Sequence, residues 1–152
     1  MTNLPSGSAI PSALIQALAI ATAALPADTT VYYGENLPKY TAPLTFMITE
    51  ITGDQKVAEL GPAFRREESF AFVCTLVYYY GGVPDFGAQL TSLMTNFVAF
   101  SQAIANNPTL NSTVRFAEVG NFHITSATDG TGQGGSTLDF SIRCQQRVTS
   151  LT

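Results

Sequence analysis

Residues 68–80 read ESFAFVCTLVYYY and form the clearest strand pattern in the chain. The even-numbered positions carry a bulky row that points to one side, namely Phe70, Phe72, Cys74, Leu76, Tyr78 and Tyr80. The odd-numbered positions are smaller but still mostly apolar, namely Ala71, Val73, Thr75, Val77 and Tyr79. Because a strand that is apolar on both sides must be covered on both sides, we expect something to lie against each face.

Hydrophobic periodicity places the other elements around this strand. Helical spacing over residues 9–25 predicts a first helix, with Ser8 or Ser12 as its cap and Pro26 as its end, and the same spacing predicts a second helix from Phe86 to Ile104. Strands are predicted over residues 29–34, 43–51 and 113–125, the last with a bulge at Gly120. Residues 53–67 fit either a hairpin arm or an irregular loop.

The last predicted strand alternates cleanly between an apolar and a polar side. The apolar side carries Leu138, Phe140, Ile142, Cys144 and Val148, and the polar side carries Asp139, Ser141, Arg143, Gln145 and Arg147. The element order is therefore α-β-β-β-α-β-β. It predicts one α+β domain over residues 1–152, with a flexible stretch at 1–8, a mainly antiparallel sheet and both helices against one face.

Composition narrows the classes of function. Hydrophobic residues make up 45% of the chain and charged residues 12%, about half the usual charged share. A surface with so little charge favours a partner or self-assembly. The net charge of −4 and the scattered basic residues argue against binding a nucleic-acid backbone.

The sequence predicts no metal site, no catalytic site and no membrane span. Cys74 and Cys144 lack a C-x-x-C pattern and sit on apolar sides of strands, which favours two reduced core thiols over a disulfide. His123 is the one histidine, and no nucleophile can be argued beside it. Residues 9–25 resemble a signal peptide, but no basic residue precedes them, Gln16 interrupts them, and they are too short to span a bilayer.

A glycine-rich hexamer, GTGQGG at residues 130–135, matches the spacing of a dinucleotide-binding fingerprint. That fingerprint works only when the glycines lead into a helix, whose free N–H groups hold the pyrophosphate. Here they lead into an alternating strand, and Ser136 stands where a phosphate loop needs lysine. We therefore expect a long hairpin tip that orders against a partner, and no bound cofactor. A small nucleotide- or ligand-binding domain remains a distant alternative.

Residues 66–148 resemble the tail-terminator, or tail-completion, proteins of long-tailed bacteriophages. Four features carry the resemblance: the strand EESFAFVCTLVYYY; the helix ending FVAFSQAIANNPTL followed closely by NSTVRFAEVGNFHI; the Gly/Asp-rich tip; and the strand LDFSIRCQQRV. The long segment 53–67 and the alanine-rich first helix are less typical of that family. They leave open another phage neck protein, a head–tail connector or stopper.

The resemblance implies a structural virion protein and not an enzyme. Such proteins assemble in the host cytoplasm into a homo-oligomeric ring of six copies at the head–tail junction. The ring caps the head-proximal end of the tail tube, stops tube polymerisation and offers the surface to which the head connector docks, while DNA passes through its lumen without specific binding.

Two groups of residues are candidates for these contacts. The first is a candidate interface with a neighbouring subunit or the tube: Arg65, Arg66, Glu67, Glu68, Val73, Val77 and Tyr79. The second is a candidate contact loop for the tube or the connector: Asp129, Gly130, Thr131, Gly132, Gln133, Gly134 and Gly135. A ring interface must join two different patches, because each subunit meets its neighbours head to tail.

Overall fold

The computed structural model of the chain describes residues 8–34, 44–59, 65–80, 85–128 and 134–149. Two helices and six strands follow one another as α1 (Ile10–Ala24), β1 (Thr30–Tyr33), β2 (Leu44–Glu59), β3 (Arg65–Tyr80), α2 (Phe86–Asn106), β4 (Phe116–Val119), β5 (His123–Thr128) and β6 (Gly134–Thr149). The strands form one sheet in the order β1-β2-β3-β6-β4, with β5 also paired to β6. Every pairing is antiparallel except that of β1 with β2, so the predicted α+β class is confirmed.

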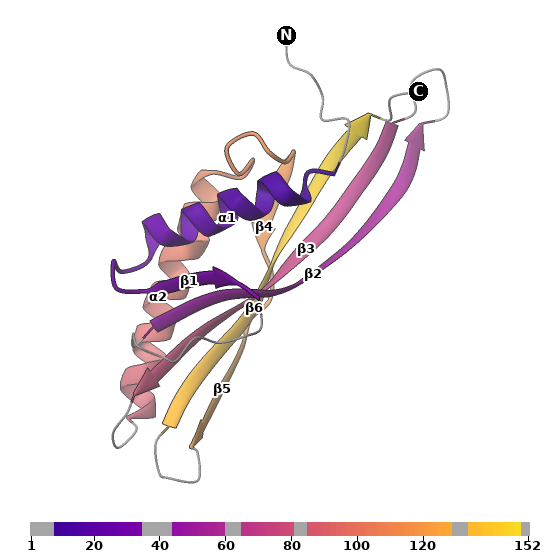
Figure 1. Cartoon of the computed structure of the whole chain (residues 1–152). Coiled ribbons are helices and arrows are strands. Elements are labelled where there is room, and N and C mark those ends of the chain that lie inside the picture. Colours follow the sequence, from indigo (N-terminus) through magenta and orange to yellow (C-terminus); the bar gives the residue numbers. More distant parts are fainter. Residues whose placement is uncertain (1–7, 35–43, 60–64, 81–84, 129–133, 150–152) are drawn as a thin grey trace.

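The central strand β3 is paired along its whole length with β6, from Arg65 opposite Thr149 to Tyr80 opposite Gly134. On its other side β3 pairs with β2. Residues 53–67, for which the sequence fits either a hairpin arm or an irregular loop, therefore form a hairpin arm in their described part. Each of these three strands has 16 residues and spans roughly 50 Å. The 21 residues of α2 span roughly 30 Å. The strands therefore run on past the helices as a three-stranded arm (Figure 1).

Both helices lie on the same side of the sheet, against the bulky row of β3 (Figure 1). Phe72, Cys74 and Leu76 are fully buried there, as the sequence predicts. Phe100 of α2 stacks on Phe46 with 5.0 Å between ring centroids, and Phe140 meets Phe100 edge-on at 5.7 Å. The start of α2 is capped by Asp85, whose side chain accepts a hydrogen bond from Ala88 N at 3.1 Å.

The first helix buries alanines rather than its larger side chains. Its inward stripe runs at every fourth position and consists of Ala9, Ala13, Ala17, Ala21 and Leu25. Ile10, Leu14 and Leu18, which also recur at helical spacing, lie half-buried at the edges of this stripe. Small side chains let a helix approach its neighbours closely, so α1 fits against α2 and β1 where bulkier residues would hold it away.

The beginning of α1 is held by a residue far away in the sequence. The N-cap of α1 is Ala9, which has no side-chain cap, so the prediction of Ser8 or Ser12 as the cap is wrong. Ser8 Oγ still accepts a hydrogen bond from Ile10 N at 3.1 Å. The buried carboxylate of Glu68 on β3 accepts a second one from Ala9 N at 2.9 Å. A negative charge at a helix N-terminus is also favoured by the helix dipole. Glu68 thus joins α1 to the sheet, which corrects the expectation that it offers its charge to a neighbouring subunit.

The predicted strand over residues 113–125 is divided into β4 and β5. Val119 lies opposite Ile142 and His123 lies opposite Asp139, so three residues face two on β6. Gly120 begins this irregularity and donates its N–H to Ser141 O at 2.7 Å. A Cβ at Gly120 would lie 2.8 Å from Ser141 Oγ, so the approach to β6 favours glycine. The bulge predicted at Gly120 is therefore present.

Replacing Glu68 should destabilise the protein through the first helix. Glu68→Ala leaves the Ala9 N–H without its buried acceptor, and we expect a loss of about 1–3 kcal/mol in the free energy of unfolding measured with urea. Glu68→Gln keeps an acceptor oxygen and should lose less. Glu67→Ala on the same strand, with its half-buried side chain facing away from the helices, is the control and should stay within about 0.5 kcal/mol of the wild type. An equal loss in the Glu67 and Glu68 alanine variants would contradict the assignment.

Both cysteines are free and buried, as predicted. Burial raises the pKa of the Cys74 thiol far above its ordinary value, and the nearby Cys144 adds to the effect. Burial alone raises the pKa of the Cys144 thiol to about 12. Neither thiol is therefore a nucleophile near neutral pH, because the thiolate is the reactive form.

These shifted thiols should make the protein less stable in alkali. An unfolded thiol loses its proton above pH ~8.5, whereas the native Cys144 thiol keeps its proton up to a pKa of about 12. The free energy of unfolding should therefore fall as pH rises, by about 1–2 kcal/mol per thiol at pH 10. Urea titrations between pH 7.5 and pH 10 measure the fall. The Cys144→Ala variant should start from a lower stability and show a shallower fall, and an unchanged slope would contradict this account.

Candidate functional site

The face of the sheet opposite the helices is only partly covered. Near the start of β2, Thr45, Met47 and Val77 are buried, with Val77 only 8% exposed. Further along the strands the side chains on this face become half-buried and then exposed. This accessible part, called here the open sheet face, consists of Glu50, Thr52 and Asp54 on β2, Ser69, Ala71 and Val73 on β3, and Ser141, Arg143 and Gln145 on β6. No described element lies over it (Figure 1).

Part of the open sheet face is concave. A groove of about 520 Å³ crosses four strands, and its lining includes the small residues Gly53, Ser69 and Ala71. Phe116 and Glu118 of β4 line it on one side, and Asp54 of β2 lines it on the other. A concave surface with small residues along it can accept protruding side chains from another molecule.

The candidate interface residues of the sequence are distributed unevenly on this surface. Val73 lies on the open sheet face and is half-buried, whereas Val77 is buried and has little accessible surface for a contact. Glu67 is half-buried on the same face and lies in register with Lys56 on β2 and Arg147 on β6. Arg65, Arg66 and Tyr79 belong to β3, and their side chains fall outside the described part of the structure.

The candidate contact loop lies mainly outside the described residues, since Asp129, Gly130, Thr131, Gly132 and Gln133 are not among them. Gly134 and Gly135 begin β6, where they pair with Thr128 and Ala127 of β5. The glycines therefore lead into a strand of a hairpin, as predicted, and a dinucleotide fingerprint would require a helix there. Just beyond them, Ser136 Oγ donates a hydrogen bond to the buried Gln89 Oε1 at 2.7 Å and joins this hairpin to α2.

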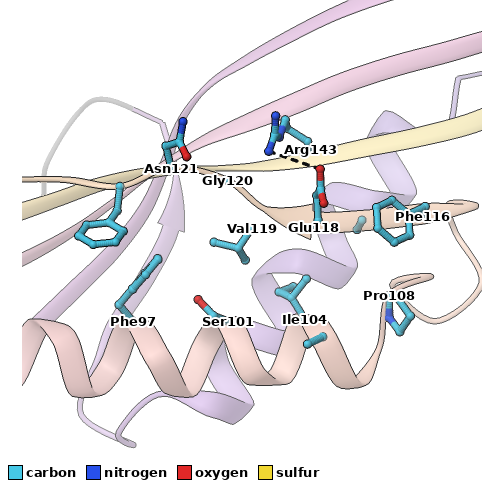
Figure 2. A pocket seen from close by; sticks show the side chains of 13 residues that line it. Phe97, Ser101, Ile104, Pro108, Phe116, Glu118, Val119, Gly120, Asn121 and Arg143 are labelled. Carbon is cyan, nitrogen blue, oxygen red and sulfur yellow. Dashed lines mark ion pairs between the residues drawn. The ribbon is translucent and has the colours of Figure 1, made fainter.

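A second groove, of about 750 Å³, lies between the C-terminal half of α2 and β4 (Figure 2). Its walls are mostly apolar, and the rings of Phe97 and Phe122, which both line it, are in contact with 5.3 Å between their centroids. Phe116 and Phe122 remain 45% and 51% exposed. Glu118 and Arg143 form an ion pair of 3.4 Å at its rim. This pair separates the two grooves, because both residues line each of them.

One residue in the sequence indicates the second groove, although hydrophobic periodicity alone does not predict the groove. Phe116 stands on the same side of its strand as Glu118, so an aromatic residue occupies the polar side of an alternating segment. Such a residue is expected either at an interface or beside a cleft. In the turn after α2, Leu110, Asn111 and Ser112 all have positive φ. That turn is tied to α1 by a 2.6 Å hydrogen bond from Asn111 Nδ2 to Gln16 Oε1.

Charge is absent from both helices. Neither α1 nor α2 contains an acidic or basic residue, so every charge of the chain lies on strands and connections. Apolar side chains also remain on the outer surface of the helices, with Ile15 64% exposed and Val98 54% exposed. A helix that faces water normally carries charges on that side, so this layer has the character of a contact surface.

The described residues hold no group of three or more His, Cys, Asp or Glu side chains placed to bind a metal ion. His123 is exposed at the start of β5, and Asp139 accepts a 2.8 Å hydrogen bond from Thr75 Oγ1. Among the same residues, neither helix has the length and apolar character needed to cross a bilayer. Comparison with known protein families and with curated proteins finds no match to the chain.

The side chain of Ser101, which lines the second groove, should lower the stability of the fold, so its replacement by alanine should raise the free energy of unfolding. Its Oγ is buried and has no hydrogen-bond partner among the described residues, which costs free energy relative to an apolar atom. Ser101→Ala should raise the free energy of unfolding by about 1 kcal/mol more than Ser92→Ala does. Ser92 is a matched control on the same helix, because its Oγ already accepts from Asn96 Nδ2 at 3.5 Å. Equal effects in urea titrations would show that Ser101 has a partner in solution.

Proposed function

We propose that the chain is the subunit of a homo-oligomeric ring that caps the head-proximal end of a phage tail tube. On this proposal the ring ends tube growth and provides the docking surface for the head connector. The resemblance of residues 66–148 to tail-terminator proteins supports the proposal that the partner is a phage tail tube. The structure supports the more general part, which is a subunit built to contact copies of itself and a neighbouring assembly.

The observation that carries the proposal is the open sheet face. Strand β3 is the centre of the sheet, and its odd-numbered side chains include Ala71 and Val73, which are half-buried in the isolated chain. Apolar residues in the middle of a sheet are normally covered. A partner that covers this face would bury Ala71 and Val73, and the uncharged helix layer on the opposite side offers a second contact surface.

Such a subunit would act by shape. A ring that binds the last layer of the tube on one face, and lacks that binding surface on its other face, ends polymerisation because the next layer has nowhere to bind. No bond is made or broken, and no cofactor is needed. The net charge of −4 per subunit would keep the lumen from holding DNA as it passes.

Two positive charges on the open sheet face should abolish capping. The variant Ala71→Lys/Val73→Lys places both on β3, where they cannot be buried against a partner without a large desolvation cost. Tail tubes mixed with the wild-type protein should be capped at one end in negative-stain images. We expect the double variant to cap at least about tenfold fewer tubes while keeping a native circular dichroism spectrum.

The control for this experiment changes the net charge by the same amount elsewhere. Asp28→Lys also adds two units of positive charge, at an exposed turn between α1 and β1. It should cap tubes like the wild type. If the wild-type protein binds filled heads and leaves tubes uncapped, the chain is a connector or stopper. If it binds neither, the proposal is wrong.

A further inference from the structure

We infer that Tyr33 of one copy inserts its side chain into the second groove of the next copy in the ring. This inference rests on the proposed function, because it names a contact by which the ring would form. Four observations support it: the exposure of Tyr33, the position and chemistry of the groove, the row of the sheet that the two share, and the charges around them.

Tyr33 is an exposed aromatic residue at one edge of the sheet. It is the last residue of β1, the outermost strand on that side, and it is 51% exposed. It lies opposite Ile48, which belongs to the core, so its side chain is on the helix side of the sheet. Tyrosine is enriched at protein interfaces, because its ring is apolar while its hydroxyl can still find a polar partner.

The second groove opens at the opposite edge of the sheet. The strand order β1-β2-β3-β6-β4 puts β4 at the other end from β1. Val119 on the helix side of β4 and Phe116 on its other side both line the groove, so the groove reaches the edge of this strand. Two copies placed side by side in the same orientation therefore bring the β1 edge of one to the groove of the other. This contact is head to tail, as a ring requires.

The chemistry of the groove suits a tyrosine side chain. Phe97, Ile104 and Phe122 supply apolar surface on which an aromatic ring can pack. Glu118 and Arg143 form their ion pair at the rim, where the Glu118 carboxylate can also accept a hydrogen bond from a tyrosine hydroxyl (Figure 2). The contact uses side chains only. The hydrogen bond that Ala117 N donates to Pro108 O, beside β4, therefore stays intact.

The register of the strands places Tyr33 and the groove at the same position along the sheet. One row of cross-strand partners runs from β1 to β6 and consists of Tyr33, Ile48, Cys74 and Phe140. The ring of Phe140 contacts that of Phe97, with 5.1 Å between centroids, and Phe97 lines the groove. A rotation from one copy to the next, without a shift along the strands, therefore brings Tyr33 to the end of the groove that Phe97 lines.

The charges around the two surfaces permit this contact. Neither α1 nor β1 contains a charged residue, and Asp28 lies in the turn before β1, whereas Tyr33 ends that strand. At the groove, Glu118 and Arg143 neutralise one another. Although each copy carries a net charge of −4, no like charges are brought together between Tyr33 and the groove.

Photo-cross-linking tests the contact directly. With p-benzoylphenylalanine in place of Tyr33, an aromatic side chain that cross-links to its neighbours occupies the same position. We mix ¹⁵N-labelled and unlabelled copies, assemble them on tail tubes and irradiate them. Mass spectrometry should find cross-links that join a labelled to an unlabelled copy, from position 33 to residues 97–122.

Filling the groove should abolish these cross-links. Ala105 is exposed on α2 and lines the groove, so Ala105→Trp places a large side chain there without disturbing the core. Ala88→Trp is the matched control, because Ala88 is exposed at the other end of the same helix and does not line the groove. The cross-link should persist in the control.

Truncation of the tyrosine should weaken assembly. Tyr33→Ala should raise the protein concentration needed for half-maximal assembly on tail tubes by about tenfold or more, because it removes an aromatic anchor. Tyr33→Phe keeps the ring and loses only the hydroxyl, so the rise should be about fivefold at most. Asp28→Ala, which removes an exposed side chain at the same edge of the sheet, should assemble like the wild type.

The outcomes separate the two proposals. Capped tubes on which position 33 cross-links only to the tube protein, to another segment of the chain or to nothing would overturn the contact and leave the capping function standing. Loss of assembly in Ala105→Trp without any loss in Tyr33→Ala would assign the groove to a different occupant and would also overturn it. A wild-type protein that neither assembles nor caps tubes would contradict both.

Discussion

The ladder that β3 makes with β2 on one side and with β6 on the other is the constraint on which the rest of the structure depends. It aligns three strands of 16 residues each, and α1 and α2 are too short to cover their whole length. The helices also occupy only one face, because the bulky side chains of β3 all point to that side. The arm and the open sheet face follow from this, because the two helices are shorter than the strands and lie on one face only.

Much of this fold can be predicted from local pattern. The alternation in β3 and β6 identifies the buried rows around Phe72 and Ile142 correctly, and the helical spacing of residues 86–104 identifies α2. Both patterns are local, because the periodicity of a helix or strand predicts which of its own residues are buried. The buried side of α1 is harder to predict from the sequence. Its alanines alternate with larger apolar residues, so hydrophobicity does not distinguish the side that packs from the side that is exposed.

The features that decide the candidate site depend on register, and register is a property of the folded sheet. Strand alternation predicts that Glu67 and Glu68 point to opposite faces, but not that Glu68 accepts from a helix N–H that lies 59 residues away in the sequence. In the same way, Asp54, Gln145 and Phe116 have nothing in common in the sequence and form one row only through β3. Cross-strand neighbours of this kind require the topology to be known first.

The core and the accessible surfaces lie in different halves of the sheet. The stacked rings of Phe46, Phe100 and Phe140 lie in the half of the sheet that the helices cover, so this half supplies a core within one chain. The open sheet face lies further along the strands, where no described element covers it. A chain built in this way can complete its core and still keep accessible apolar and charged surface. The low share of charged residues fits the same division, because the few charges are concentrated on strands and connections while both helices have none.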